Sequence, residues 1–196
     1  MFTGIVTAVG RITKTEARDQ GLRLVIDAGM LDLSDVAVGD SIAVNGVCLT
    51  AVALHGDRFE VDASQETINC TVGLDGPNEV NLEKSLRLSD RLGGHLMSGH
   101  VDGVGEVRRF ERAGESYLLV IRAPQDLAKY IARKGSITVN GVSLTVNRVD
   151  GTDFEINLIP HTLTVTNLKN IQAGSRVNLE VDLVARYIER LQHYGA

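Results

Sequence analysis

Short runs of apolar, β-branched residues alternate with turn-forming residues along most of this chain. Ile42–Val44 and Val47–Leu49 flank Asn45-Gly46, and a similar pair of runs flanks Asn140-Gly141. Asn-Gly supplies the two positive φ angles of a type I′ turn, so both places predict a β-hairpin. Turn signals at intervals of about ten residues predict short antiparallel strands, as in a small barrel or sandwich.

Three further segments predict a helix instead of strands. In residues 124–135, Pro124 suits a first helical turn and Gly135 suits a C-terminal stop. Residues 30–39 hold the corresponding place in the first half and predict a shorter or looser version. Residues 184–191 predict an amphipathic helix, because Val184, Tyr187, Ile188 and Leu191 follow the i, i+3, i+4, i+7 spacing. That helix either packs on its own barrel or joins subunits.

The chain contains an internal duplication, which is its most informative feature. Residues 41–50 match residues 136–145 at eight of ten positions, an offset of 95. The same offset places residues 2–6 on 97–101, and Val80-Asn81-Leu82-Glu83 corresponds to Val177-Asn178-Leu179-Glu180. Two hairpins that arose independently would not keep one offset over this length. We therefore predict an all-β fold of two tandem domains.

Differences between the two halves show where distinct chemistry can lie. Cys48 corresponds to Ser143, Ile5 to His100, Asp62 to Asn157, Ser85 to Asp182, and Gln65-Glu66-Thr67 to Pro160-His161-Thr162. The sequence thus predicts two pockets that share a ligand shape but carry different nucleophilic and acid–base groups.

Each of these residues also has a structural interpretation. A thiol at Cys48 is a better nucleophile than a serine hydroxyl, but a lone cysteine is often a small buried hydrophobic residue, which is what we expect of Cys70. His100 can move protons near neutral pH, or can be a structural histidine. Ser143, Thr145 and Thr50 suit hydrogen bonds to a polar heterocycle or polyol, yet threonine is also common in strands.

Composition excludes several classes of protein. The formal net charge is −5 with no basic tract, which argues against nucleic acid as a partner. No run approaches the roughly 20 apolar residues of a membrane span, and the first residues do not resemble a signal peptide. Two cysteines are too few for a disulfide framework, and no His/Cys cluster has metal-ligand spacing. We expect a cytoplasmic protein without a structural metal.

The same motifs resemble those of the riboflavin synthase family, the trimeric type with two lumazine-binding repeats. The resemblance rests on the N-terminal MFTGIV, on NGVCLT and NGVSLT after each hairpin, on GGHLMSGH over residues 93–100, and on Leu158-Ile159-Pro160. It covers essentially the whole chain.

The resemblance implies two six-stranded Greek-key barrels, residues 1–95 and 96–183, followed by an oligomerisation helix over 184–196. It implies a homotrimer whose active site lies between the N-terminal barrel of one subunit and the C-terminal barrel of another. The reaction is a transferase reaction: two molecules of 6,7-dimethyl-8-ribityllumazine give riboflavin and 5-amino-6-ribitylamino-uracil, with no cofactor or metal. An association with lumazine synthase is a further possible partnership.

The family's motifs also assign site residues. Catalytic assistance falls on Ser41, Cys48, His100 and Asp182. Substrate contacts of the first barrel fall on Gly4, Ile5, Val6, Cys48, Leu49, Thr50, Asp62, Ala63, Ser64, Gln65, Glu66 and Thr67. Those of the second barrel fall on Gly99, His100, Val101, Lys134, Ser143, Leu144, Thr145, Ile159, Pro160, His161, Thr162, Leu163 and Thr164. His161 departs from the family, where an acidic residue is frequent.

Two other functions compete with the synthase. One is a non-catalytic carrier of a lumazine or flavin on the same fold. The other is a flavin-dependent reductase barrel, but such a protein normally carries a nicotinamide-binding α/β domain, and no strand–GxGxxG–helix unit is present.

Overall fold

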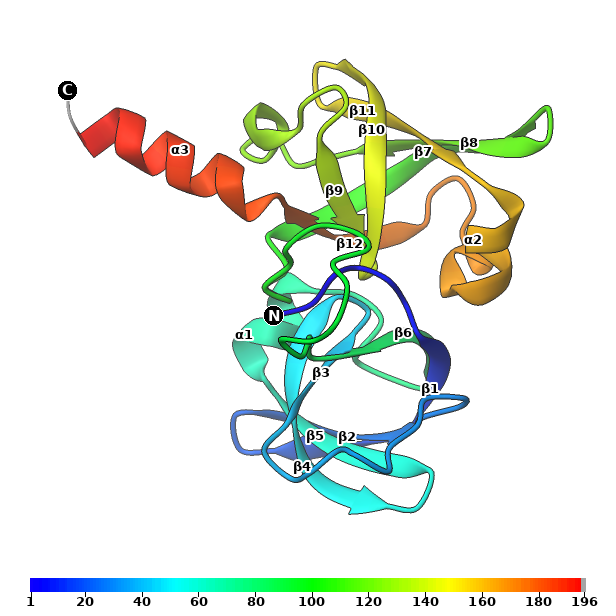
Figure 1. Cartoon of the computed structure of the whole chain (residues 1–196), viewed down its shortest axis with the longest axis vertical. Coiled ribbons are helices and arrows are strands. Elements are labelled where there is room, and N and C mark those ends of the chain that lie inside the picture. The colour runs from blue at the N-terminus through cyan, green and yellow to red at the C-terminus, as the bar shows by residue number, and fades with distance from the viewer. Residues whose placement is uncertain (195–196) are drawn as a thin grey trace.

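Two closed, six-stranded antiparallel barrels make up most of the computed structural model, which describes residues 1–194 (Figure 1). The strands of the first barrel are β1 (Ala8–Arg18), β2 (Gly21–Asp27), β3 (Ser41–Val44), β4 (Val47–His55), β5 (Arg58–Ser64) and β6 (Asn78–Lys84). Those of the second are β7 (Gly103–Ala113), β8 (Ser116–Arg122), β9 (Ser136–Val139), β10 (Val142–Asp150), β11 (Asp153–Leu158) and β12 (Arg176–Val181). The spatial order β1-β2-β5-β4-β3-β6 recurs as β7-β8-β11-β10-β9-β12.

Each barrel has its own hydrophobic core, and the two cores are built from corresponding positions. Phe59 on β5 and Phe154 on β11 are both fully buried, and so are Ile12 and Val107 on the first strand of each barrel. Inward and outward side chains alternate along these strands, so the apolar residues of each repeat fill the barrel interior. The predicted all-β fold of two barrels is confirmed.

Both predicted hairpins form as expected. Asn45 and Asn140 have φ angles of 50° and 47°, and the glycines that follow have φ angles of 83° and 80°. All four angles are positive, as a type I′ turn requires. The two turns also meet at the junction between the barrels, because a Cβ on Gly46 would lie 2.8 Å from the backbone nitrogen of Gly141.

The short helical elements differ from the expectation. Residues 124–135, which predict a short helix, contain only a 3₁₀ turn, η1 (Ala128–Tyr130); residues 30–39 form turns. Three short elements are not predicted from the sequence: α1 (Gln65–Cys70), α2 (Pro160–Val165) and the 3₁₀ turn η2 (Asn167–Asn170). Six residues are too few to show a 3.6-residue periodicity, although Ser64 and Pro160 are recognisable start signals.

The C-terminal helix α3 (Leu183–Tyr194) leaves the second barrel, as the red ribbon of Figure 1 shows. Glu189 accepts hydrogen bonds from Lys129 and the Tyr130 hydroxyl, and Arg186 pairs with Asp102, so the helix is attached to its own barrel on one side. Its apolar side chains stay mostly exposed: Val184, Tyr187, Ile188 and Leu191 are 60%, 64%, 51% and 73% exposed. In the part of the chain that the structure describes, no helix is long and apolar enough to cross a bilayer.

Candidate functional site

Residues 2–6 precede β1 and residues 97–101 precede β7, and each of these two exchanged segments contacts the opposite barrel. Ser143 on β10 donates its backbone N–H to the carbonyl oxygen of Gly4 (2.8 Å), and Cys48 on β4 donates in the same way to Gly99 (2.8 Å). Phe2 and Met97 pair where the segments cross. The sequence grouped residues 4–6 with the first barrel and 99–101 with the second; in the structure each segment contacts both barrels, because Gly4 and Gly99 also donate their N–H groups to Glu83 on β6 and Glu180 on β12.

Side-chain packing follows the same exchange. Val6 packs against the core of the second barrel, and Val101 packs against the core of the first. Gly4 and Gly99 have φ angles of 75° and 79°, and a Cβ on either would overlap Ser143 or Cys48. Glycine is therefore required at both positions, because the left-handed backbone and the close approach leave no room for a side chain.

Cys48 and residues 99–101 form the first of two related sites. A Cβ on Gly99 would lie only 2.6 Å from the Cβ of Cys48. His100 is the next residue in the chain after Gly99. Cys48 is half-buried with a free thiol, and His100 is exposed. A thiol from the first half of the chain thus lies against the segment of the second half that carries an imidazole.

The second site contains a histidine that the sequence analysis left without a function. His95 Nδ1 lies 2.7 Å from Ser143 Oγ, and its Nε2 lies 3.4 Å from Thr138 Oγ1. Burial lowers the pKa of His95, and the nearby Asp182 carboxylate opposes that shift. The signal in the sequence was weak: GGHLMSGH contains two histidines, and only folding shows that His95 reaches Ser143.

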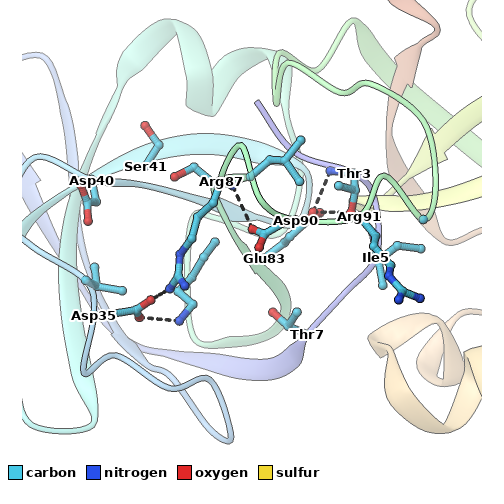
Figure 2. Close-up of a pocket in the computed structure, with 15 residues that line it drawn as sticks. Thr3, Ile5, Thr7, Asp35, Asp40, Ser41, Glu83, Arg87, Asp90 and Arg91 are labelled. Carbon is cyan, nitrogen blue, oxygen red and sulfur yellow. Dashed lines mark hydrogen bonds and ion pairs between the residues drawn. The ribbon is translucent and has the colours of Figure 1, made fainter.

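A cavity of about 680 Å³ lies on the first barrel, against the exchanged segment (Figure 2). Thr3, Ile5 and Thr7 line one wall, and Ser41 and Glu83 contribute from β3 and β6. A cavity of about 240 Å³ lies at the corresponding place on the second barrel and is lined by Ser98, His100, Val101, Asp102, Glu180, Val181, Leu183 and Arg186. The duplication therefore produced two unequal hollows, one beside Ile5 and the other beside His100.

The four candidate catalytic residues occupy different settings. Ser41 begins β3 and lines the larger cavity, Cys48 lies on β4 against Gly99, and His100 lines the smaller cavity. Asp182 lies between β12 and α3, where its carboxylate accepts the backbone N–H of Val184 (3.0 Å).

The remaining candidates lie on strand ends and short helices. Residues 65–67 start α1, whose Ile68 packs on the first core, and residues 160–164 lie in α2, whose Leu163 packs on the second. His161 is exposed. Asp62, Ala63 and Ser64 line a separate depression, and the Arg23 guanidinium lowers the pKa of Asp62. Leu49 is buried, whereas Thr50, Thr145 and Ile159 are exposed; Leu144 is partly buried.

Lys134 has an unusual backbone. Its φ angle is 67°, in the left-handed region, where the first half has Gly39 with a φ angle of 102°. A residue held in this region costs free energy, and such residues gather at functional sites.

Cys70, expected to be buried, is instead exposed, with its thiol donating to Glu66. Within residues 1–194, no three His, Cys, Asp or Glu side chains gather in an arrangement suited to a metal ion.

Comparison with known proteins gives a consistent picture. Residues 3–85 and 98–182 match the lumazine binding domain family. The chain is 41% identical to the riboflavin synthase of Brucella abortus (strain 2308), over 99% of both chains. It is 46% identical to that of Mycobacterium tuberculosis (strain ATCC 25618 / H37Rv), over 97% of this chain and 98% of the relative.

Solved structures of LumP share the fold. LumP complexed with 6,7-dimethyl-8-(1'-D-ribityl) lumazine is 31% identical, with a TM-score of 0.82 over 92% of this chain and 99% of that chain. LumP complexed with riboflavin is 33% identical over the same fractions, with a TM-score of 0.83.

Proposed function

The chain belongs to the riboflavin synthase family, and on this premise we propose that it makes riboflavin from two molecules of 6,7-dimethyl-8-ribityllumazine. One lumazine transfers a four-carbon unit to the other, which leaves 5-amino-6-ribitylamino-uracil as the second product. The observation that carries the proposal is a pair of related sites with unequal chemistry. Cys48 on β4 and Ser143 on β10 hold corresponding places, and Ser143 is hydrogen-bonded to His95. His100 lines the cavity of the second barrel where Ile5 lines that of the first. Two copies of one fold bind the same ligand twice, and their different side chains give the two molecules different fates.

The chemistry needs a proton removed from the C7 methyl group of one lumazine and a nucleophile or water added at C7 of the other. We assign proton transfer to His100, and to Cys48 the activation of bound substrate as nucleophile or proton donor. Ser143, hydrogen-bonded to His95, provides a polarised hydroxyl at the second site. Holding two flat rings together replaces a collision between dilute molecules, and good orientation corresponds to effective molarities of about 10⁵–10⁸ M.

We further propose that the active site is completed between subunits of a homotrimer. The cavity beside Ile5 and Ser41 and the cavity beside His100 are separate in one chain, so a site that uses residues of both takes the first barrel of one subunit and the second barrel of another. The exposed apolar side chains of α3 support assembly through that helix. An association with lumazine synthase and a cytoplasmic location remain predictions.

Purified protein mixed with the lumazine alone tests the function. Riboflavin absorbance and fluorescence should appear without any added cofactor, together with the uracil product in equal amount. A folded protein that forms no riboflavin would refute the synthase.

The carrier is the second candidate, because the similar LumP structures hold a lumazine or riboflavin. Tight binding of the lumazine without any product would support it. The presence of Cys48, His100 and Ser143 together favours the enzyme.

A further inference from the structure

Two buried carboxylates hold the exchanged segments, and no step of the proposed reaction uses them. Glu83 is the last residue of the Val-Asn-Leu-Glu motif on β6, and Glu180 is the last residue of the same motif on β12. Their exposed fractions are 6% and 3%. Among residues 1–194, neither carboxylate takes part in a salt bridge within 4.0 Å. Each instead collects hydrogen bonds from the segment that contacts the opposite barrel.

The two sets of hydrogen bonds are the same. Glu83 Oε1 accepts the backbone N–H and the hydroxyl of Thr3 (both 2.7 Å), and Oε2 accepts the N–H of Gly4 (2.9 Å). Glu180 Oε1 accepts the N–H and hydroxyl of Ser98 (both 2.7 Å), and Oε2 accepts the N–H of Gly99 (3.0 Å). In Figure 2, dashed lines join Thr3 to Glu83, with Ile5 nearby at the cavity wall.

The hydroxyls extend each network to the next residue. Thr3 Oγ1 accepts the N–H of Ile5 (3.1 Å), and Ser98 Oγ accepts the N–H of His100 (3.3 Å). Because each hydroxyl donates to the glutamate, it is free to accept from that N–H. Each carboxylate therefore orients three successive backbone units.

Stability alone does not account for these carboxylates. Burial raises the pKa of both Glu83 and Glu180, which means that their ionised forms are less favourable in the folded chain than in water. A well-packed apolar residue would be a more stabilising choice at such a position. Yet both halves carry the same Glu with Thr or Ser, while the neighbouring site residues differ, Cys48 against Ser143 and Ile5 against His100.

We propose that Glu83 and Glu180 are positioning residues that set the backbone of the two ligand-contact segments, so that Glu180 places His100 in the cavity of the second barrel and Glu83 places Ile5 in that of the first. The inference rests on the proposed synthase function and extends it to two residues outside the substrate contacts. The two positions should differ in kinetic effect, because His100 carries acid–base chemistry and Ile5 provides only contact.

The test compares Glu180→Gln and Glu83→Gln in the full-length protein. Glutamine keeps the shape, but its amide nitrogen cannot accept the N–H that Oε2 receives. Glu180→Gln should lower kcat about tenfold or more and change KM less than about threefold, the size expected for losing a hydrogen bond to a charged group. Glu83→Gln should instead raise KM about tenfold with a smaller change in kcat.

Controls separate positioning from general damage. Glu155→Gln on β11 and Glu79→Gln on β6 change partly exposed glutamates outside the site and should leave both constants near wild type. Ser98→Ala should lower kcat, as Glu180→Gln does. Ser98→Thr should retain more activity than Ser98→Ala, because the Thr3 hydroxyl makes the same hydrogen bond at the corresponding position of the first repeat.

Three results would overturn the proposal. The first is that both glutamine variants have the same kinetic constants as the Glu155→Gln control. The second is that Ser98→Ala keeps the wild-type kcat. The third is that kcat and KM change only in proportion to the loss of thermal stability. If the wild type itself makes no riboflavin, the synthase is refuted. Weaker binding of riboflavin to Glu83→Gln, measured by fluorescence quenching, then still tests the placement.

Discussion

Asn81 on β6 and Asn178 on β12 hold corresponding positions, and each donates a side-chain hydrogen bond to the hairpin of the opposite barrel. Asn81 Nδ2 donates to the Asn140 carbonyl oxygen at 2.8 Å, and Asn178 Nδ2 donates to that of Asn45 at 3.2 Å. Both asparagines are almost fully buried. This reciprocal pair ties the barrels together where the two turns meet, and so sets how each exchanged segment lies against the other barrel.

Asn178→Ala should destabilise the protein by about 1–3 kcal/mol, because it leaves buried polar groups without partners. The lost bonds include those to the N–H and carbonyl of Val72 as well as to Asn45. Urea unfolding measures the change. Asn170→Ala removes an exposed hydrogen bond to Glu79 and should cost no more than about 0.5 kcal/mol. Equal effects of the two substitutions would contradict the importance of the buried pair.

Gly46→Ala should be more destabilising than Gly56→Ala. Both glycines have positive φ angles, 83° and 63°, so both substitutions carry a backbone cost of about 1–2 kcal/mol. Only at Gly46 would the new Cβ also overlap the backbone of Gly141, at 2.8 Å. That overlap should add about 1–3 kcal/mol. Thermal and urea unfolding of the two variants isolate the contact between the hairpins, and matching losses would show that the turns do not press on each other.

The stability difference between the wild type and the double variant Glu83→Gln/Glu180→Gln should depend on pH. Burial raises the pKa of both carboxyls, so the native chain keeps their protons at a pH where the unfolded chain has released them. The protonated carboxyls' favourable contribution is therefore complete below the ordinary glutamate pKa and is lost as the pH rises through the raised pKa. Relative to the variant, the wild type should become less stable from about pH 4.3 upward. His95 is common to both proteins, so its titration cancels unless the substitutions change it. A wild-type advantage that grows with pH would reverse the expected sign.

Cys48→Ser and His100→Ala should reduce turnover more than ligand binding. Loss of a group that acts in proton transfer lowers kcat by roughly 10²–10⁴-fold, whereas the backbone contacts around Gly99 do not depend on either side chain. Steady-state turnover of the lumazine and a fluorescence titration with riboflavin give the two quantities. Cys70→Ser changes an exposed thiol at the end of α1 and serves as the control. Wild-type rates in both site variants would show that these two residues do not perform the chemistry.

A chain that stops before Val184 should form smaller species in analytical ultracentrifugation. Removing α3 removes the exposed apolar side chains that are available to a neighbouring subunit. Leu191→Glu should act in the same direction within the intact chain, and Arg190→Gln should not. If the shortened chain still sediments as an assembly of the same number of subunits as the full-length protein, assembly uses another surface.

The duplication can be recognised from the amino-acid sequence, and most of the fold follows from it. The two Asn-Gly turns, the alternating strands and the helical spacing of residues 184–191 are local patterns, and local patterns depend on backbone preferences that neighbouring residues already specify. The difference in residue type between Cys48 and Ser143 is also visible in the sequence, because it appears when one half of the chain is aligned with the other.

Which residues contact one another became clear from the folded chain, not from the sequence. The exchange of the segments at Gly4 and Gly99, the contact of His95 with Ser143 and the burial of Glu83 and Glu180 join positions 48 to 139 residues apart in the chain. No local preference encodes such contacts, since they arise when two barrels close and the segments between them must satisfy their own backbone hydrogen bonds. Motif order therefore indicated the candidate site residues, and the packing of the barrels gave Ser143 and the two glutamates their partners.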